Sequence, residues 1–260
     1  MTEQNVGKLN QIERTLPEGM LVDSAWMERN GYSTSLRSQY VSAGWLVQPV
    51  RGTYKRPLGE LDWQKVTVSL QTLMGYDFVV GGRTALDLHG FSHYVSPAEP
   101  PHAHLYGSSQ PPGWLAKLPL RTKFHVHPVA PLFRTARLEN TVRDFSSASG
   151  LLLIVSTPER ALLELLNELP NRESFHQVDM LIEGLRTLSP RRVQSLLTDC
   201  KSVKVKRLFF WFAERHNPPW LKDLDRKLVD LGSGKRMLVK GGKLDPKYLI
   251  TVPDDMNAPV

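Results

Sequence analysis

The sequence predicts an α+β protein made of a small N-terminal domain and a larger mixed domain. Two observations predict this class: helical patterns and a strand pair fill the first 57 residues, and a strand-rich middle then leads into long amphipathic helices. A chain of 260 residues can bury two cores. We place the domains at 1–57 and 58–260, because the segment RPLGELD (56–62) carries Pro and Gly that interrupt the pattern on both sides.

The small domain contains five local patterns: helices over 3–15, 25–30 and 33–44, then strands over 46–50 and 53–55 about an Arg-Gly turn. Ser33 can cap the third helix, and Gly44 can end it in the left-handed conformation. Three helices followed by a β-ribbon are the parts of a winged helix-turn-helix. In that fold the third helix enters the major groove of DNA and the wing rests on phosphates.

The third helix has one apolar side. Leu36, Tyr40 and Ala43 share a stripe that is expected to face the core. Away from it fall short hydroxyl residues, which can approach base edges and phosphates closely, and a cation that can bond a guanine edge at two points; these are Thr34, Ser35, Arg37, Ser38 and Ser42. Arg51, Lys55 and Arg56 are expected to project from the ribbon. The alternatives are a face exposed only to water and a winged helix that binds protein.

The rest of the chain is a larger mixed α/β domain. It begins with a helix over 63–74 and continues with strands and one short helix; the strands cover 77–80, 101–106, 123–129 and 151–155, and the short helix covers 84–89. STPERALLELLNELP and LSPRRVQSLL each start with a capping residue and a proline, which is the pattern of a helix N-terminus. SVKVKRLFFWFAERH is a further helix. A hairpin is expected about Gly241 and Gly242, and DDMNAPV is expected to fray.

Positive charge is concentrated near the C-terminus. The whole chain carries a formal charge of +7, and residues 191–243 alone hold fourteen Lys or Arg against five Asp or Glu. In SVKVKRLFFWFAERH the cations are expected to lie outside the apolar stripe; they are Lys204, Lys206, Arg207 and Arg215. A basic face of this size favours a polyanionic partner such as nucleic acid.

The location of the protein is predicted from three further features. The first residues lack the basic start and apolar stretch of a secretory signal, and purely apolar runs such as 151–155 are too short to cross a bilayer. The single cysteine, Cys200, allows no internal disulfide. We expect a cytoplasmic protein with no membrane span.

Two features of the sequence bear on enzyme chemistry. GGRTALD is similar to the start of a nucleotidyltransferase site, but its Asp87 comes too early and no second carboxylate follows in LHGFSHY. A nuclease needs clustered carboxylates to hold a divalent ion, whereas Asp144, Glu159, Glu164 and Glu168 are spread along helices or their approaches. We predict no catalytic residues and no cofactor.

Four histidines leave one alternative open. His102 and His104 alternate on one predicted strand, and His125 and His127 on another, so four imidazoles could surround a metal if the strands are neighbours. The apolar residues between them already explain two half-buried strands, and no acidic residue is near to orient ligands. We predict no metal, and the pattern alone does not decide the point.

The assembled segments resemble AbiEi-type antitoxins of bacterial AbiE abortive-infection systems, which are type IV toxin-antitoxin systems. The resemblance lies in LPEGMLVDSAWMERNGYSTSLRSQYVSAGWLVQPVRGTYKRP, GGRTALDLHG, STPERALLELL, SVKVKRLFFWFAERH and DLGSGKRMLVKGGKLDPKYLITVP, and it spans nearly the whole chain. It implies a winged helix that binds inverted repeats in its own promoter and represses the operon. It also implies a C-terminal domain that counters an AbiEii-like nucleotidyltransferase toxin without a stable complex.

The resemblance also implies the residues that contact double-stranded DNA. On the helix and wing these are Ser33, Thr34, Ser35, Arg37, Ser38, Arg51, Lys55 and Arg56; in the basic C-terminal motifs they are Lys204, Lys206, Arg207, Lys235, Arg236 and Lys240. Two other functions remain open at this point: a stand-alone winged-helix regulator and a metal-dependent enzyme acting on nucleic acid.

Overall fold

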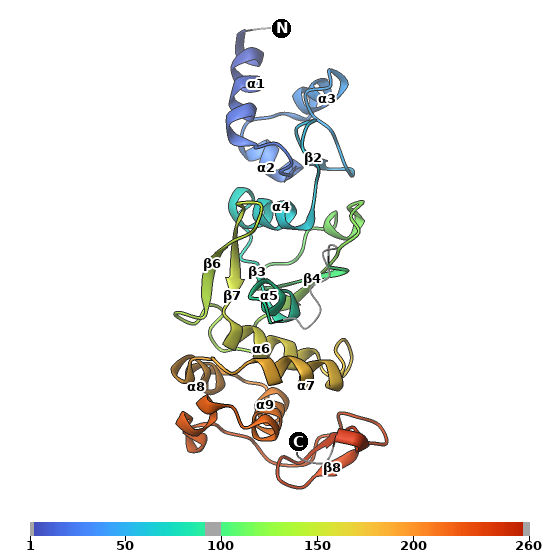
Figure 1. The fold of residues 1–260 in the computed structure, drawn as a ribbon. Coiled ribbons are helices and arrows are strands. Elements are labelled where there is room, and N and C mark those ends of the chain that lie inside the picture. Colours follow the sequence, from blue (N-terminus) through green and yellow to red (C-terminus); the bar gives the residue numbers. More distant parts are fainter. Residues whose placement is uncertain (1–2, 92–99, 257–260) are drawn as a thin grey trace.

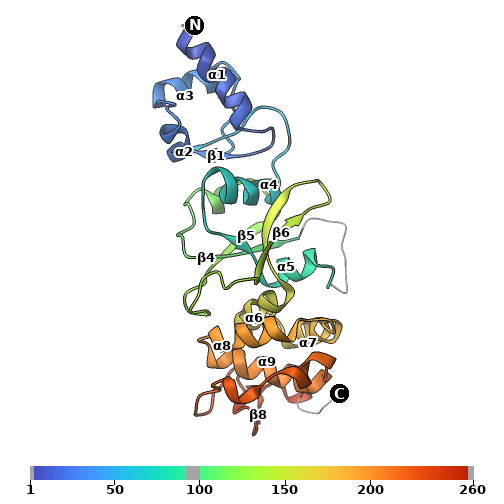
Figure 2. The same cartoon turned by 90° about the vertical axis from the view of Figure 1, so that its left-hand side faces the viewer.

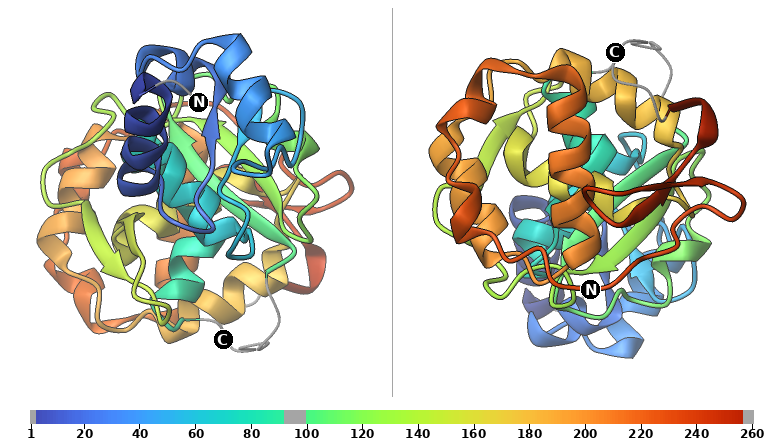
Figure 3. Two further views of the ribbon diagram at one scale, coloured as in Figure 1. Left: turned by 90° about the horizontal axis from the view of Figure 1, so that it is seen from above. Right: turned by 90° about the horizontal axis from the view of Figure 1, so that it is seen from below.

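The molecule is long, and its parts follow one another along the long axis. The computed structural model describes residues 3–91 and 100–256. The N-terminal helices lie at one end, a β-sheet lies in the middle, and the C-terminal helices and the last strands lie at the other end (Figures 1 and 2). Seen along the long axis from either end, the outline is round (Figure 3).

The N-terminal part contains helices α1 (Glu3–Thr15), α2 (Ser24–Arg29) and α3 (Thr34–Ser42) and short strands β1 (Val22–Asp23) and β2 (Thr53–Tyr54). Side-chain caps set two of the helix starts: the Asp23 carboxylate accepts from the Trp26 N–H, and the Ser33 hydroxyl accepts from the Leu36 N–H. Gly44, at φ +77°, ends α3 as predicted.

The predicted ribbon is only partly correct. β2 pairs with β1, which lies before α2, and the segment 46–50 contributes a single bridge between Val47 and Lys55. Two local bonds explain why this segment is not a strand: the Thr53 hydroxyl donates to the Val50 carbonyl and accepts from the Val50 N–H, closing a tight turn. The wing therefore depends on the pairing of β1 with β2, two strands that are about thirty residues apart in the sequence.

The middle of the molecule is a five-stranded mixed sheet with the order β5-β4-β3-β7-β6. Its strands are β3 (Val79–Val80), β4 (His102–Gly107), β5 (Lys123–Pro128), β6 (Val142–Ser146) and β7 (Leu152–Ser156). β4 runs parallel to β5, and β3 runs parallel to β7. Helix α4 (Trp63–Val68) and the π-helical turn η1 (Ser69–Leu73) lie on the side toward the winged helix, whereas α5 (Gly82–Leu88) lies on the opposite side (Figure 1).

Helices dominate the chain from residue 158 onward, as predicted. α6 (Pro158–Glu168), α7 (Phe175–Gly184), α8 (Pro190–Asp199) and α9 (Val203–His216) stack below the sheet (Figure 2). Short 3-10 turns lie between the helices and strands and at the C-terminal end of the described chain; they are η2 (Leu115–Lys117), η3 (Pro219–Asp223), η4 (Arg226–Leu228) and η5 (Asp254–Met256). The α+β class with an N-terminal helix-turn-helix and a larger mixed C-terminal part is thus confirmed.

The C-terminal hairpin is displaced from its predicted turn. β8 (Lys243–Asp245) pairs with β9 (Ile250–Val252), so the turn lies over residues 246–249 and not at Gly241 and Gly242. The Asp245 carboxylate fixes this turn by accepting from the Lys247 and Tyr248 N–H groups. In the segment DDMNAPV, residues 254–256 form η5 with Met256 buried, which corrects the expectation of a frayed end there; residues 257–260 lie outside the described chain.

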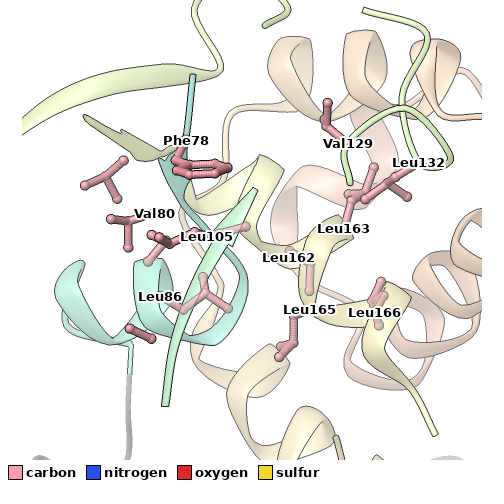
Figure 4. Close-up of a cluster of buried hydrophobic side chains, with 14 of the residues drawn as sticks. Phe78, Val80, Leu86, Leu105, Val129, Leu132, Leu162, Leu163, Leu165 and Leu166 are labelled. Atoms are coloured by element: carbon pink, nitrogen blue, oxygen red, sulfur yellow. The ribbon is translucent and has the colours of Figure 1, made fainter. Parts of the chain in front are cut away.

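One hydrophobic core runs through the described chain. Buried side chains from Ile12 in α1 to Met256 in η5 form one contact cluster. Its centre packs the sheet against α5 and α6, where Phe78, Leu105 and Leu162 lie close together (Figure 4). The winged helix joins this core at η1, where the Leu21 N–H donates to the buried Ser69 hydroxyl. The boundary between residues 57 and 58 stays a prediction.

Candidate nucleic-acid interface

The outward face of α3 carries no charge. Successive residues of a helix turn by about 100°, so residues three and four apart share a face. Ser35, Ser38, Gln39 and Ser42 lie on one side, and all four are exposed. Tyr40 is buried on the opposite side, and Leu36 is half-buried there. Ala43, which was expected in the core, is exposed at the end of the helix.

Arg37 points inward, which corrects the prediction that it lies on the outward face. Only 5% of the residue is exposed. Its guanidinium donates to the Ser24 carbonyl at 2.8 Å and to the Thr34 hydroxyl at 2.7 Å, and it lies over the Tyr54 ring at 5.8 Å. It therefore connects α3 to α2 and to the wing, and in this conformation it cannot contact a guanine edge.

The three predicted wing cations have different surroundings. Arg51 is exposed at the turn before β2. Lys55 folds back, and its ammonium donates to the carbonyls of Arg56 and Gly59 at 2.8 and 2.9 Å. Arg56 pairs with Glu18 at 3.0 Å. Arg51 is thus the wing cation that is best placed to contact a phosphate. Lys55 and Arg56 instead stabilise the segment that follows the wing.

The cations of α9 face the protein interior, contrary to prediction. Arg207 is 2% exposed and Lys206 is 5% exposed. The Lys204 ammonium donates to the Asn167 carbonyl at 2.6 Å and the Leu169 carbonyl at 2.9 Å. Arg215 pairs with Asp179 at 3.2 Å. Lys204, Arg207 and Arg215 bond carbonyls and carboxylates of α6, α7 and the C-terminal segment. The apolar stripe of α9 therefore did not reveal which cations face solvent.

Arg207 shows how such a cation is used. Its Nε donates to the Leu231 carbonyl at 2.7 Å, and its Nη1 donates to the carbonyls of Gly234 at 2.6 Å and Leu249 at 3.3 Å. These acceptors lie on the loop that follows η4 and on the turn before β9. One buried guanidinium thus fastens the C-terminal segment to α9.

Lys235, Arg236 and Lys240 are exposed on that segment, next to Met237, which is 77% exposed. Lys222, Lys227 and Lys243 are exposed as well, although they were not among the predicted contacts. The segment that carries β8 lies at the opposite end of the long axis from α3 (Figures 1 and 2). A duplex that touched both regions would have to follow the length of the molecule.

The four histidines contact one another in pairs. β4 and β5 are neighbours, and His102 Nδ1 lies 3.0 Å from His125 Nε2, while His104 Nδ1 lies 3.0 Å from His127 Nε2. Contrary to the expectation that no acidic residue is near, Glu168 lies 3.2 Å from His127 Nδ1. In the described parts of the chain, no group of three or more His, Cys, Asp and Glu residues is arranged to hold a metal.

Burial controls the charge of His104. It lowers the pKa of His104 to about 3, with smaller effects from neighbouring His127 and His125. His104 is therefore neutral at physiological pH. Its ring stacks on His127, and His127 also stacks on Tyr106. The histidine rings of β4 and β5 therefore form a packed polar layer between the sheet and α6.

The Gly-Gly turn before α5 is filled by a buried ion pair. The Glu164 carboxylate accepts from the Gly82 N–H at 3.0 Å, from the Ser156 hydroxyl at 3.1 Å and from Arg160 at 2.8 Å. A Cβ at Gly81 would lie 2.2 Å from Glu164 Oε2, so only glycine fits. The Gly-Gly turn is thus packed closely against the side chain of Glu164.

Sequence reasoning missed Gln39. It was not among the predicted contacts, although it lies in the middle of the outward face. The helical periodicity could have found it, because Gln39 is four residues after Ser35 and three before Ser42.

A winged helix with a polar outward face, followed by a body with exposed cations, defines the class of DNA-binding transcriptional regulators. The chain belongs to the AbiEi antitoxin family of type IV toxin-antitoxin systems. Residues 101–253 match the model described as transcriptional regulator, AbiEi antitoxin, type IV toxin-antitoxin system, and residues 5–97 match the model of the AbiEi antitoxin N-terminal domain. The predicted family is therefore confirmed.

The fold has a solved relative. The crystal structure of the RV2827C protein from Mycobacterium tuberculosis superposes with a TM-score of 0.56 at 15% sequence identity, covering 96% of this chain and 92% of that one. At this identity the similarity concerns the fold alone. The comparison with curated proteins gives no match. Within the described residues, no helix is both long and apolar enough to span a membrane.

Proposed function

We propose that the protein represses its own operon by binding inverted repeats in the promoter, and that it counteracts a nucleotidyltransferase toxin encoded beside it. The observation that carries the DNA-binding half is the exposed face of Ser35, Ser38, Gln39 and Ser42 on α3, with Arg51 on the adjacent wing. Hydroxyl and amide groups can bond base edges, and a wing cation can hold a phosphate. A promoter target places this activity in the cytoplasm.

The remaining predicted contacts play different parts in the proposal. Ser33 and Thr34 lie at the exposed start of α3, where a backbone phosphate can approach, and Lys235, Arg236 and Lys240 offer a second cationic region. Arg37, Lys204 and Arg207 act indirectly, by holding the elements that carry the contacts. Lys55 and Arg56 stabilise the chain that follows the wing. Lys206 is buried, and we assign it no contact with DNA. The proposal contains no chemical step and assigns no catalytic residue.

The test of repression is binding to the DNA upstream of the gene. We expect a dissociation constant of about 10⁻⁸ M or tighter at moderate salt, and weaker binding to a scrambled fragment. Ser38→Glu should abolish the specific binding, because a carboxylate on the outward face repels phosphates. Ser195→Glu, on the exposed side of α8, is the matched control. Equal affinity for both fragments would disprove the proposal.

The test of antitoxin activity is growth of cells that express the neighbouring toxin gene. We propose that the C-terminal domain counters the toxin, so Ser38→Glu should restore growth as well as the wild type does while failing to repress. Size-exclusion chromatography of the two purified proteins should show two separate peaks. A gene without a toxin beside it, together with no rescue of growth, would instead indicate a stand-alone regulator.

A further inference from the structure

The recognition helix offers only one long polar side chain to DNA. With Arg37 turned inward, the exposed face of α3 consists of three serines and Gln39. A serine hydroxyl both donates and accepts, so it bonds any base edge or a phosphate with little preference. A glutamine amide carries a donor and an acceptor at fixed positions. That pattern matches adenine in the major groove, whose N7 accepts and whose N6 donates.

The orientation of the helix face that carries Gln39 is fixed by the neighbouring residues. Tyr40 is buried and packs against Tyr32, with ring centroids 6.4 Å apart. The Gln39 carbonyl accepts from the Ala43 N–H at 2.9 Å, so the last turn of the helix is closed. On the other side, Arg37 connects α3 to the Ser24 carbonyl. The helix therefore cannot roll about its axis without breaking these contacts.

The amide of Gln39 is also free to bind. Its side chain is exposed and has no hydrogen-bond partner among the residues that the structure describes. A glutamine engaged inside the protein would lose a bond on turning to DNA, whereas this one exchanges only water.

We infer that Gln39 is a specificity-determining residue that reads one adenine in each half of the operator. This inference rests on the proposed binding of promoter DNA and names the residue that selects the sequence. The serines around it and Arg51 on the wing then place the helix, while the amide discriminates.

The experiment measures the affinity of wild type and Gln39→Ala for the operator and for variants in which each A·T pair is changed in turn to G·C. For the wild type, one symmetric position should lower the affinity by about 5- to 150-fold, the range of a good two-point contact. Gln39→Ala should show no preference at that position and unchanged preferences elsewhere. Gln177→Ala, an exposed glutamine on α7, is the matched control and should behave as wild type.

The outcomes separate two failures. If the wild type discriminates among operators and Gln39→Ala keeps every preference, the inference is wrong and the proposed function stands. If the wild type binds operator and scrambled DNA equally, the proposed function is wrong, and Gln39 has no sequence to read. Thermal unfolding of Gln39→Ala at the wild-type temperature would show that lost discrimination is not lost folding.

Discussion

Replacing Arg207 by methionine should lower the stability of the protein and leave the salt dependence of its DNA binding unchanged. The side chain is buried and donates to three carbonyls, two of them at 2.7 and 2.6 Å. Methionine fills the stem of the arginine but leaves those acceptors unpaired. The acceptors lie on half-buried or exposed residues that water can reach, so we expect the loss of this charged donor to cost about 1.5 to 3 kcal/mol in all.

The assay compares Arg207→Met with Arg236→Gln. In a chain of this length the expected loss lowers the melting temperature by on the order of 5 °C. Arg236 is exposed, so its replacement should leave the melting temperature unchanged and reduce the slope of log affinity against log salt by about one for each lost phosphate contact. An Arg207→Met protein that melts like the wild type but shows a reduced slope would refute the interior role of Arg207.

Two other perturbations probe the body of the molecule. Glu164→Gln should destabilise the fold by about 3 to 5 kcal/mol, because it leaves buried Arg160 without its counter-charge; urea unfolding measures this, and the exposed Glu13→Gln should have no effect. The pKa of His104 falls from 6.5 to about 3 on folding, so the unfolded chain binds more protons between these values and the free energy of unfolding should rise with pH there, by up to about 1.4 kcal/mol per pH unit. His104→Asn should reduce that rise in urea titrations from pH 4 to 7. An unchanged rise would show that His125 and Glu168, whose pKa values are also lowered by their surroundings, account for it.

Local chemistry made the helix boundaries predictable. The proline starts of α6 and α8 follow Thr157 and Ser189, and both helices begin where expected. The bond that a cap should make was less predictable: the Ser189 hydroxyl accepts from a backbone N–H, whereas the Thr157 hydroxyl is buried without a partner within the described chain. A cap residue therefore marks a helix start even where its side chain does not bond.

The surroundings of the cations could not be predicted, because their partners are far away in the sequence. The acceptors of Arg207 lie 24 to 42 residues further along the chain, and Arg37 donates to a carbonyl 13 residues earlier. A helical stripe identifies the apolar side, but it does not reveal whether a cation beside that stripe meets water or a remote carbonyl. The pairing of β1 with β2 was missed for the same reason, because nothing local links them.

Ser35, Ser38, Gln39 and Ser42 hold no other part of the protein in place, since they are exposed and the buried contacts of α3 come from its other side. Substitutions there should change stability by no more than about 0.5 kcal/mol. New target sequences are thus accessible through single mutations that leave the scaffold intact. After duplication of such an operon, the two copies could diverge in these four residues and in their promoters, and so become independent of each other.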